Sequence, residues 1–323
     1  MKIDVGIVNY NGGEHLLRCV RSLLAMEDSA VQIWVLDNAS TDGSLQKLRQ
    51  ANLPVQIIAS AQNLGYAGAF NKLNEHFSAE VCTVANMDLV FDSRWSRAVR
   101  SSLATQKDYS ALASLILHED GATINATGIV FEADLHPHNQ NFGRAAQGDN
   151  LRSKEVFGCY GAVITYRRSA LEAVGPMESS FFLFYEETEW FWRLQLAGLK
   201  TLFSPQPVVY HARSLVTVKG SLLKLYYPER NRMRTLLRLV PFWYLPWAVL
   251  YSIKRMIQGS KSPQFKSLNQ QSHSKFKLAS TVLRAWLAAL KYLPSDLRWR
   301  RQFFRQFPAA RGQTLAILRK YLR

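Results

Sequence analysis

The chain has 323 residues, of which 48% are hydrophobic and 20% charged, so it can bury a sizeable core in one large domain or two smaller ones. Cys19, Cys82 and Cys159 lie far apart, and no CxxC pair or Cys/His cluster exists. This argues against a disulfide framework or a zinc site and favours a reducing compartment. The first residues, MKIDVGIVNYNGG, lack the apolar run of a signal peptide and are typical of a first strand.

The charge is divided unevenly along the chain. Residues 1–211 hold 17 Lys and Arg against 22 Asp and Glu, a net charge of −5, whereas residues 212–323 hold 23 against 2, a net charge of +21. We therefore predict two parts that meet different partners, one at residues 1–212 and a basic one at residues 213–323.

The N-terminal part alternates strand and helix patterns. Apolar runs bounded by turn residues predict strands at 3–10, 32–38, 55–60 and 81–88. Between them, Leu, Val and Phe spaced three and four residues apart predict helices at 13–26, 44–52 and 68–77. Such alternation predicts an α/β fold with a mostly parallel sheet covered by helices, in which ligands bind beyond the carboxyl ends of the strands.

Each of these four strands leads into a polar segment. The segments are Asn9 to Gly13, Asp37 to Gly43, Asn63 to Gly68, and Asn86 to Asp88. Turn and capping chemistry would explain one such segment, because Asn, Asp and Gly populate turns in any protein. Four in succession at the same edge of one sheet indicate a polar ligand site.

The chemistry of this edge suits a nucleotide and a cation. The GxGxxG fingerprint of dinucleotide sites and the Walker A motif are both absent. Asp37 suits hydrogen bonding to a base or ribose. Asp88 suits a divalent cation between protein and diphosphate, since Mg²⁺ is commonly held by one or two carboxylates plus substrate phosphates.

An acidic and aromatic segment, FFLFYEETEWFWR, spans residues 181–193. From Glu186 onward its pattern predicts a helix that ends at Gly198, a residue suited to a C-cap. At three- and four-residue spacing, Glu187 shares a face with Trp190 and the apolar residues that follow it. The neighbouring face carries Glu186 and Glu189 together with Arg193, which Glu189 can pair with at i,i+4.

The three glutamates of this segment have two interpretations. They could simply be first-turn acids that the helix dipole favours. That interpretation leaves Glu187 on the apolar face unexplained. There, apolar neighbours raise the carboxyl pKa while the helix terminus lowers it, which suits a general base. The aromatic residues of the segment either line a ligand site or, for most of them, belong to the core: Phe182, Phe184, Tyr185, Trp190 and Trp192.

The basic C-terminal part contains an apolar run and two amphipathic patterns. Residues 241–253, PFWYLPWAVLYSI, are interrupted by Pro246 and are too short to span a bilayer, and residues 276–293 and 297–307 are basic and amphipathic. This combination predicts interfacial helices on an anionic membrane surface. Nucleic acid would be the competing partner, but no helix-turn-helix, RRM or zinc motif appears. The basic residues that flank the apolar run are Arg230, Arg232, Arg234, Arg238, Lys254 and Arg255.

Taken together, the motifs resemble those of family 2 glycosyltransferases of the GT-A fold, and more narrowly the rhamnosyltransferase-like branch that builds bacterial surface polysaccharides. The similarity covers roughly residues 3–235, with the motifs in the family's order at compatible spacings. It implies a GT-A domain followed by a basic, amphipathic helical region. The motifs are DVGIVNYNGGEHLLRCVRSLL, VLDNASTDGS, NLGYAGAFN, NMD, GAVITYRRSALEAVGPMESSFFLFYEETEWFWRLQLAG and VVYHARS.

The resemblance implies roles for individual residues. Tyr10 and Asp37 would hold the nucleotide base and ribose. Asp88, in Asn86-Met87-Asp88, would bind Mg²⁺ or Mn²⁺ where the family has its DxD-type motif, and His211 would close the metal or diphosphate site. Glu187, which matches the Asp of the family's Glu-Asp pair, would deprotonate the acceptor hydroxyl. Further nucleotide-sugar contacts would come from Asn11, Asn63, Gly65, Asn71 and Asn86, and the acceptor side from Glu186, Glu189, Trp190 and Arg193.

Several residues depart from the family's pattern. Glu186-Glu187-Thr188-Glu189 replaces the usual Glu-Asp-x-Asp, and Glu178 replaces an Asp in the preceding turn. An extra methylene moves a carboxylate by roughly 1 Å or more, a misplacement that can matter greatly for rate. Leu73 stands where relatives often carry Gly.

The implied activity is single-displacement, inverting transfer of a sugar, with L-rhamnose from dTDP-rhamnose as the first choice. The acceptor would be polyprenyl-linked or an oligosaccharide, at the cytoplasmic face of the cell membrane, and no nucleic-acid partner is expected. Two alternatives stay open. One is a galactofuranosyl or other hexosyl transferase. The other is a non-catalytic, membrane-docked protein that binds sugar nucleotides or glycans, which the Glu-for-Asp changes allow.

Overall fold

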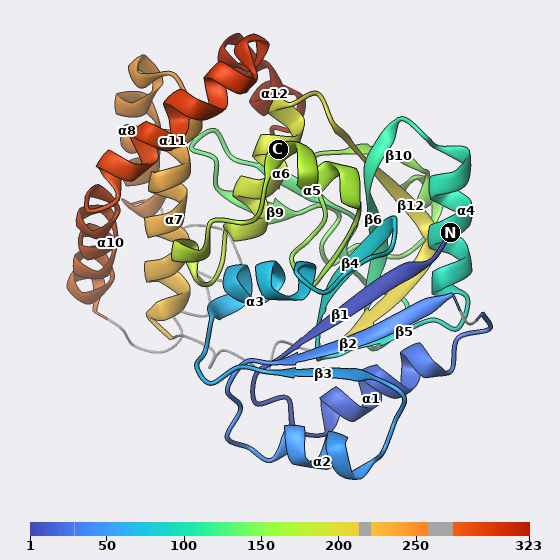
Figure 1. Cartoon of the computed structure of the whole chain (residues 1–323). Coiled ribbons are helices and arrows are strands. Elements are labelled where there is room, and N and C mark those ends of the chain that lie inside the picture. Colours follow the sequence, from blue (N-terminus) through green and yellow to red (C-terminus); the bar gives the residue numbers. More distant parts are fainter. Residues whose placement is uncertain (29, 213–220, 258–273) are drawn as a thin grey trace.

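A ten-stranded sheet forms the centre of the computed structural model, which describes residues 1–28, 30–212, 221–257 and 274–323 (Figure 1). Its strand order is β10-β12-β6-β11-β4-β1-β2-β3, with β5 added beside β12 and β7 beside β6. The first six strands are β1 (Ile3–Asn9), β2 (Val31–Asp37), β3 (Gln56–Ala59), β4 (Val81–Asn86), β5 (Leu89–Phe91) and β6 (Tyr109–His118). The other strands of this sheet are β7 (Ile124–Ala126), β10 (Lys154–Val156), β11 (Val163–Arg167) and β12 (Lys200–His211), while β8 (Ile129–Phe131) and β9 (Pro137–Asn139) form a separate two-stranded sheet.

The four predicted strands pair in parallel, as expected, and their carboxyl ends meet at one edge. Asn9 lies opposite Asp37, and Asp37 lies opposite Ala59. On the other side of β1, Val8 lies opposite Asn86. The polar segments that follow these strands are therefore neighbours in space, as the sequence predicted.

Beyond β4 the sheet is mixed, so the expectation of a mostly parallel sheet holds for β1 to β4 only. β11 runs antiparallel to both β4 and β6, whereas β12 runs parallel to β6. Parallel neighbours need long crossovers, usually helical. The fully described stretch between β6 and β11 contains short strands and one 3₁₀ turn, η1 (Gly148–Leu151), but no α-helix. Without a crossover helix, the chain enters β11 in the direction opposite to β6.

Helices cover both faces of the sheet. Those packed around the strands are α1 (Gly13–Leu24), α2 (Ser44–Gln50), α3 (Gly65–Asn74), α4 (Trp95–Thr105), α5 (Arg168–Val174) and α6 (Glu186–Leu196). Alternate residues of β1 separate two cores: Ile3, Val5 and Ile7 join α1 and α4, while Val8 joins α3 and α6. Gly6 also faces α3, where an added Cβ would lie 2.7 Å from Leu73. Leu73 fills this space, which explains how the fold accommodates a leucine there.

The C-terminal helices share the hydrophobic core on the α3 side. They are α7 (Leu223–Leu239), α8 (Leu245–Ile257), α10 (Lys275–Leu290), α11 (Leu293–Gln306) and α12 (Thr314–Lys320). Leu236 and Phe303 belong to the same buried cluster as Phe70 and Trp190. The chain end returns to the strands, where the Phe131 N–H donates to Tyr321 O at 3.0 Å. The division at 212/213 stays a prediction, and residues 213–220 lie outside the described part.

Four of the arginines predicted to flank the apolar run are buried instead. The interpretation of these residues as membrane-facing charges is wrong, because each is satisfied by contacts inside the protein. Arg232 pairs with Glu229 at 2.6 Å, and Arg234 pairs with Asp296 at 2.8 Å. Burying a charge is costly without a partner. The four are Arg230, Arg232, Arg234 and Arg238. Of the two basic residues after the run, Lys254 is exposed, and the side chain of Arg255 lies outside the described part.

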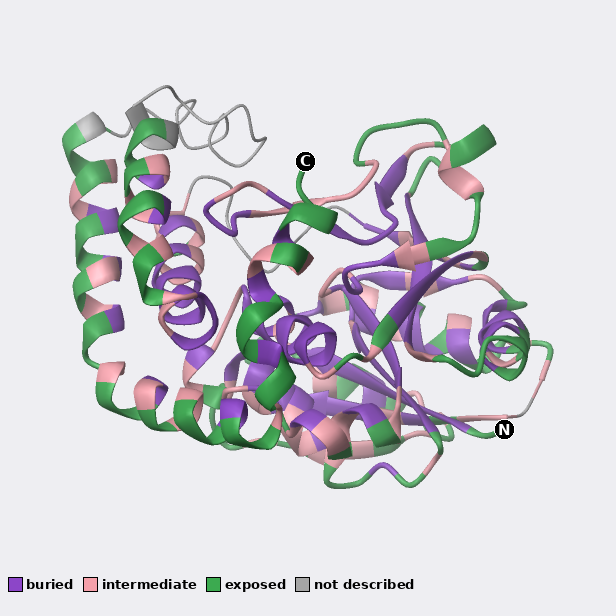
Figure 2. Cartoon of the chain, turned by 90° about the horizontal axis from the view of Figure 1, so that it is seen from above, coloured by how far each residue is buried: buried purple, intermediate pink, exposed green. Residues whose placement is uncertain are grey.

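Exposed residues are frequent on the outer helices, whereas the strands and inner helices are largely buried (Figure 2). The predicted amphipathic segments are helical: the apolar run forms the 3₁₀ turn η3 (Phe242–Tyr244) and α8, and the later patterns form α10 and α11. In the ranges that the structure describes, no helix has the length and apolar character needed to cross a bilayer.

Candidate active site

The first polar segments are organised around Asp37, which is buried at the end of β2. Its Oδ1 accepts a hydrogen bond from Asn9 Nδ2 at 2.7 Å, and its Oδ2 accepts one from the Ser40 N–H at 3.1 Å. Asn9 Nδ2 also lies 3.0 Å from Ser44 Oγ. The carboxylate is thus fixed at the sheet edge where a nucleotide is predicted to bind. The sequence indicates Asn9 only as the first residue of the polar segment at the end of β1 and does not predict its contact with Asp37.

The loops after β1 and β2 are joined by further hydrogen bonds. Asn11 Oδ1 accepts from the Thr41 N–H at 2.8 Å, and the Asn11 N–H donates to Ser40 Oγ at 3.0 Å. Asn11 and Ala39 adopt left-handed backbone conformations, with φ of 52° and 63°. Non-glycine residues in this region are strained and concentrate at functional sites. Tyr10 is half-buried and lies between Asn9 and Asn11, whose side chains are both held by hydrogen bonds.

The third polar segment, Asn63 to Gly68, connects the sheet edge where a nucleotide is predicted to bind with the residues that precede α6. Asn63 Oδ1 accepts from Asn38 Nδ2 at 3.0 Å and from the Gly65 N–H at 2.8 Å. Gly65 has φ of +68°, and an added Cβ would lie 2.1 Å from Phe182 O, so only glycine fits. The Tyr66 N–H donates to the same carbonyl at 2.7 Å.

Asn71 contacts protein rather than an open site. Its Oδ1 accepts from the Met177 N–H at 2.9 Å, and its Nδ2 donates to Met177 O at 2.8 Å and to Ser179 Oγ at 3.0 Å. Asn71 therefore fastens α3 to the segment that leads into α6. A nucleotide contact by Asn71 stays a prediction.

Asp88 and His211 lie together beyond β4 and at the end of β12. Their Oδ2 and Nε2 atoms are 3.4 Å apart, and both residues are buried. His211 Nδ1 is 3.4 Å from Asn125 Oδ1. The buried Oδ1 of Asp88 has no hydrogen-bond partner. An unpartnered buried carboxylate oxygen fits a hard cation.

The two residues would supply only part of a cation's ligands. Among the described residues, no group of three or more His, Cys, Asp and Glu side chains could hold a metal ion. Mg²⁺ usually keeps several non-protein ligands, including substrate phosphates, so a site of this size fits a cation that binds with a diphosphate. Asn86 is half-buried two residues before Asp88, and its N–H donates to Ala162 O at 2.9 Å.

Glu187 lies in the first turn of α6 after an unusual backbone segment. Phe182, Phe184 and Tyr185 have φ of 66°, 63° and 74°, so three non-glycine residues just before the helix are left-handed. The helix begins at Glu186, as predicted, and ends close to the predicted Gly198. Glu187 is half-buried, whereas Glu186 is buried.

The environments of the two adjacent glutamates push their pKa values apart. Burial raises the pKa of Glu187 to about 6, although backbone N–H groups of the first turn oppose the shift. Burial and the neighbouring Glu187 carboxylate raise the pKa of Glu186 well above its ordinary value. Both shifts are upward, and the one at the more deeply buried Glu186 is the larger. Divergent pKa values in a carboxyl pair indicate which member is the base.

Tyr160 and Gly161, before β11, adjoin both halves of the site. An added Cβ at Gly161 would lie 3.0 Å from Glu187 Oε1, so the carboxylate packs on bare backbone. Burial and the charges of Glu187 and Asp88 raise the pKa of Tyr160 to about 12. The ring of Tyr160 lies 6.2 Å from that of His211. Tyr160 is thus near both the candidate base and the candidate metal ligands, a placement that no local pattern revealed.

The other residues predicted for the acceptor side are buried in protein contacts. Glu189 Oε2 pairs with Arg193 Nε at 3.1 Å, as the i,i+4 spacing predicted, and Glu189 Oε1 lies 3.3 Å from Arg238. Trp190 Nε1 donates to Gly175 O at 2.9 Å. Their acceptor role stays a prediction. Of the aromatic residues, Tyr185, Trp190 and Trp192 are buried, and Phe182 and Phe184 are half-buried.

Glu178, one of the Glu-for-Asp departures, has a structural contact set. Its Oε1 accepts from Ser180 Oγ at 2.6 Å, and its Oε2 lies 3.3 Å from Arg238 Nη1. The side chain thus caps the 3₁₀ turn η2 (Ser179–Phe181) while it reaches an arginine of α7.

Comparisons with known sequences agree with these observations. The family described as glycosyl transferase family 2 matches residues 4–175, more than half of the chain. Over 235 residues the chain is 26% identical to the N-acetylglucosaminyl-diphospho-decaprenol L-rhamnosyltransferase of Mycobacterium tuberculosis, covering 66% of this chain and 76% of the relative. A low-salt glycan biosynthesis hexosyltransferase of Haloferax volcanii is 27% identical over 203 residues, covering 59% of this chain and 61% of the relative.

Solved structures share the fold at lower sequence identity. GalNAc-T7 with UDP, GalNAc and Mn²⁺ has a TM-score of 0.62 at 15% identity, covering 96% of this chain but 58% of that longer chain. A mannosyltransferase from Pyrobaculum calidifontis in complex with GDP-Man and Mn²⁺ has a TM-score of 0.54 at 14% identity, covering 91% and 87%. The predicted GT-A fold with a helical C-terminal region is confirmed. The chain therefore belongs to glycosyl transferase family 2 and resembles the rhamnosyltransferases of that family.

Proposed function

We propose that this glycosyltransferase is inverting and metal-dependent and moves L-rhamnose from dTDP-rhamnose to a polyprenyl-linked or oligosaccharide acceptor in surface-polysaccharide synthesis. The observation that carries the mechanism is geometric: Glu187 packs on Gly161, and the neighbouring Tyr160 lies beside the buried Asp88–His211 pair, its ring 6.2 Å from that of His211. Burial also raises the pKa of Glu187 to about 6, as a general base requires. The sugar and the lipid-linked acceptor are taken from the 26% identical Mycobacterium tuberculosis relative.

Each part of the site has a task in the proposed reaction. Tyr10 and Asp37 hold the base and ribose of the donor. Asp88 and His211 would hold Mg²⁺ or Mn²⁺, and the cation would supply positive charge to the nucleotide diphosphate as its bond to the sugar breaks. Glu187 takes the proton of the acceptor hydroxyl as its oxygen attacks the anomeric carbon. The bond from that carbon to the diphosphate breaks, the electron pair leaves with the nucleotide, and the configuration inverts.

A donor screen tests this proposal. Purified protein with Mn²⁺ is expected to release dTDP from dTDP-rhamnose when a lipid-linked acceptor is present, and EDTA is expected to abolish the release. Asp88→Ala should lose the metal-dependent activity. Asp149→Ala removes an exposed carboxylate on the surface turn η1 and should retain it. Turnover of UDP-galactofuranose or another hexose donor would show that the donor sugar is not rhamnose and would leave the proposed transfer reaction in place. Nucleotide binding without turnover of any donor would favour the non-catalytic alternative.

We also propose that the protein attaches peripherally to the inner face of the cell membrane. Large apolar side chains are exposed along η3, α8 and α10: Trp243 is 71% exposed, Leu250 66% and Phe276 84%. Beside η3, a cavity of about 370 Å³ is lined by Phe242 and by Arg300, Arg301 and Arg311. None of these arginines pairs with a carboxylate of the described residues. Exposed aromatic side chains beside unpaired cations suit an anionic lipid surface.

Vesicle co-sedimentation tests this attachment. The protein is expected to sediment with phosphatidylglycerol vesicles at low salt, and less with phosphatidylcholine vesicles or at high salt. The double variant Trp243→Ser/Trp247→Ser should lower the partition coefficient at least tenfold. Phe142→Ser is the matched control, because Phe142 is 47% exposed away from these helices and Trp247 is 46% exposed. Equal binding by both variants would refute this surface as the attachment site.

A further inference from the structure

We propose that Asn231 and Arg230 of α7 are positioning residues for catalysis: they hold the backbone of residues 180–185 and thereby aim Glu187 at the acceptor. This inference rests on the proposed function. It goes beyond that function because it assigns part of the catalytic geometry to α7, a helix that supplies none of the residues of the proposed reaction.

The two side chains bind four backbone carbonyls of one short segment. Asn231 Nδ2 donates to Phe184 O at 2.7 Å, to Phe181 O at 2.9 Å and to Leu183 O at 3.2 Å. Arg230 Nη2 donates to Ser180 O at 2.9 Å and to Phe181 O at 2.8 Å. Arg230 Nε also donates to Asn231 Oδ1 at 2.9 Å, so the two side chains orient each other.

The segment needs this support because its own backbone is strained. Three of its residues are left-handed without being glycine, and each such residue costs on the order of 1–3 kcal/mol. The turn also points its carbonyls toward α7. A buried carbonyl without a partner costs about 1–3 kcal/mol. Without the Asn231 side chain, the Leu183 and Phe184 carbonyls would lose the donor that they have among the described residues. The strained turn would then relax.

The conformation of this turn sets the position of Glu187. Tyr185 is the last residue before α6 and Glu187 is the second residue of the helix, so a rotation at Phe184 or Tyr185 swings the carboxylate directly. The same turn contacts the donor side of the site, where Phe182 O accepts from the Tyr66 N–H at 2.7 Å. A displacement of about 1 Å at a reacting group can lower a rate about 100-fold.

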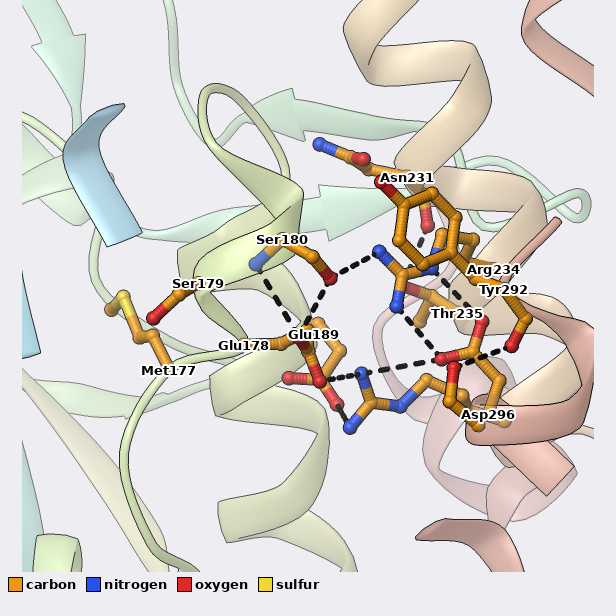
Figure 3. Close-up of polar contacts among 12 residues, drawn as sticks. Met177, Glu178, Ser179, Ser180, Glu189, Asn231, Arg234, Thr235, Tyr292 and Asp296 are labelled. Atoms are coloured by element: carbon orange, nitrogen blue, oxygen red, sulfur yellow. Dashed lines mark hydrogen bonds and ion pairs between the residues drawn. The ribbon is translucent and has the colours of Figure 1, made fainter. Parts of the chain in front are cut away.

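α7 is a rigid base for these contacts. Arg234 forms a bidentate pair with Asp296 of α11, at 2.8 and 2.9 Å, and its Nη1 donates to Ser180 Oγ at 2.8 Å. Figure 3 shows Asn231 and Arg234 on α7 beside Ser180, with Asp296 on the far side. The buried Arg234–Asp296 ion pair thus holds α7, the helix that carries Asn231 and Arg230, against α11.

Steady-state kinetics of Asn231→Ala test the role, with whichever donor the wild-type protein turns over. We expect kcat to fall at least tenfold while the donor KM stays within twofold. The acid limb of kcat/KM should move to lower pH, because a displaced Glu187 becomes better hydrated and leaves Glu186, Tyr66, Tyr160 and Tyr185, the titratable groups around it. Thr235→Val is the matched control: Thr235 is buried one turn along α7, and in the described part of the chain its hydroxyl donates to Asn231 O of the same helix and to no other group.

Hydrogen exchange gives a readout that does not depend on activity. Backbone amides of residues 180–187 should exchange faster in Asn231→Ala than in wild type and Thr235→Val. If the wild type turns over no donor, the proposed function fails, while this comparison still decides whether α7 holds the turn. Wild-type kcat in a folded Asn231→Ala, or unchanged exchange, would overturn the inference. Should Asn231→Ala not fold, Arg230→Met removes two of the five carbonyl contacts and is judged by the same two measurements.

Discussion

Exchange of Glu187 for glutamine is expected to lower kcat by about 10²–10⁴-fold, the usual contribution of a general base, while donor KM changes little. Glutamine keeps the size of the side chain and its packing on Gly161 but cannot take the acceptor proton. Initial rates of nucleotide release with saturating acceptor measure the effect. Glu186→Gln is the adjacent control and should lose far less, because Glu186 is more deeply buried and burial raises its pKa well above its ordinary value, which disfavours the charged form that a base needs. A fully active Glu187→Gln would show that another group is the base.

The pH profile provides an independent check of the same assignment. A base works only in its deprotonated form, so kcat/KM of the wild type should be half-maximal near pH 6, the pKa of Glu187, fall further as the pH drops, and become level about one pH unit higher. The residual activity of Glu187→Gln should lack this acid limb. A profile that stays level down to pH 4.5 would contradict the raised pKa.

Removal of the Asp296 carboxylate is expected to lower the free energy of unfolding by about 3–5 kcal/mol, the effect of leaving a buried charge without its partner. Asp296 is buried on α11 and holds Arg234 with both oxygens, and Arg238 lies 3.8 Å from its Oδ1. Asp296→Ala would leave these arginines in the interior with fewer compensating charges. Chemical denaturation of the purified variant measures the loss.

The matched control for Asp296 is an exposed ion pair. Asp149 and Arg152 lie 3.0 Å apart with side chains that are 84% and 79% exposed. Asp149→Ala should therefore change the unfolding free energy by less than about 1 kcal/mol, because solvent screens exposed pairs. Equal stability of the two variants would contradict a structural role for the buried ion pairs. In the double variant Asp296→Leu/Arg234→Met, the loss should be smaller than in Asp296→Ala, since no unpaired charge is created at that pair.

Local patterns predicted the parts of the fold that depend on local physics. The strands β1 to β4 and helices α1 to α3 follow from apolar periodicity and turn residues, and each begins and ends within a few residues of its predicted bounds. The shared polar edge follows from the parallel pairing of these strands. The start of α6 and the Glu189–Arg193 pair were also predictable, because i,i+4 spacing brings these residues together in any helix.

The remaining features depend on residues far apart in the sequence. Asn125 meets His211, and Asp134 and Asp296 meet arginines of α7, only after the sheet and the C-terminal helices pack together. The buried arginines were mistaken for surface charges because arginine is almost never fully buried unless it is paired, and the partners could not be identified from the sequence. Tyr160 escaped notice for a related reason, because its loop has no distinctive composition.

The contact between the chain end and β8 has a consequence for how the protein is made. The Phe131 N–H donates to Tyr321 O and the Arg323 N–H donates to Phe131 O, so β8, a strand of the small two-stranded sheet, is bonded by residues that are synthesised long after it. Until α11 and α12 emerge, their part of the apolar surface on the α3 side stays uncovered. Domains that complete their core this late expose apolar surface in intermediates during translation. The nascent chain of this transferase should therefore depend on chaperones until α11 and α12 have docked.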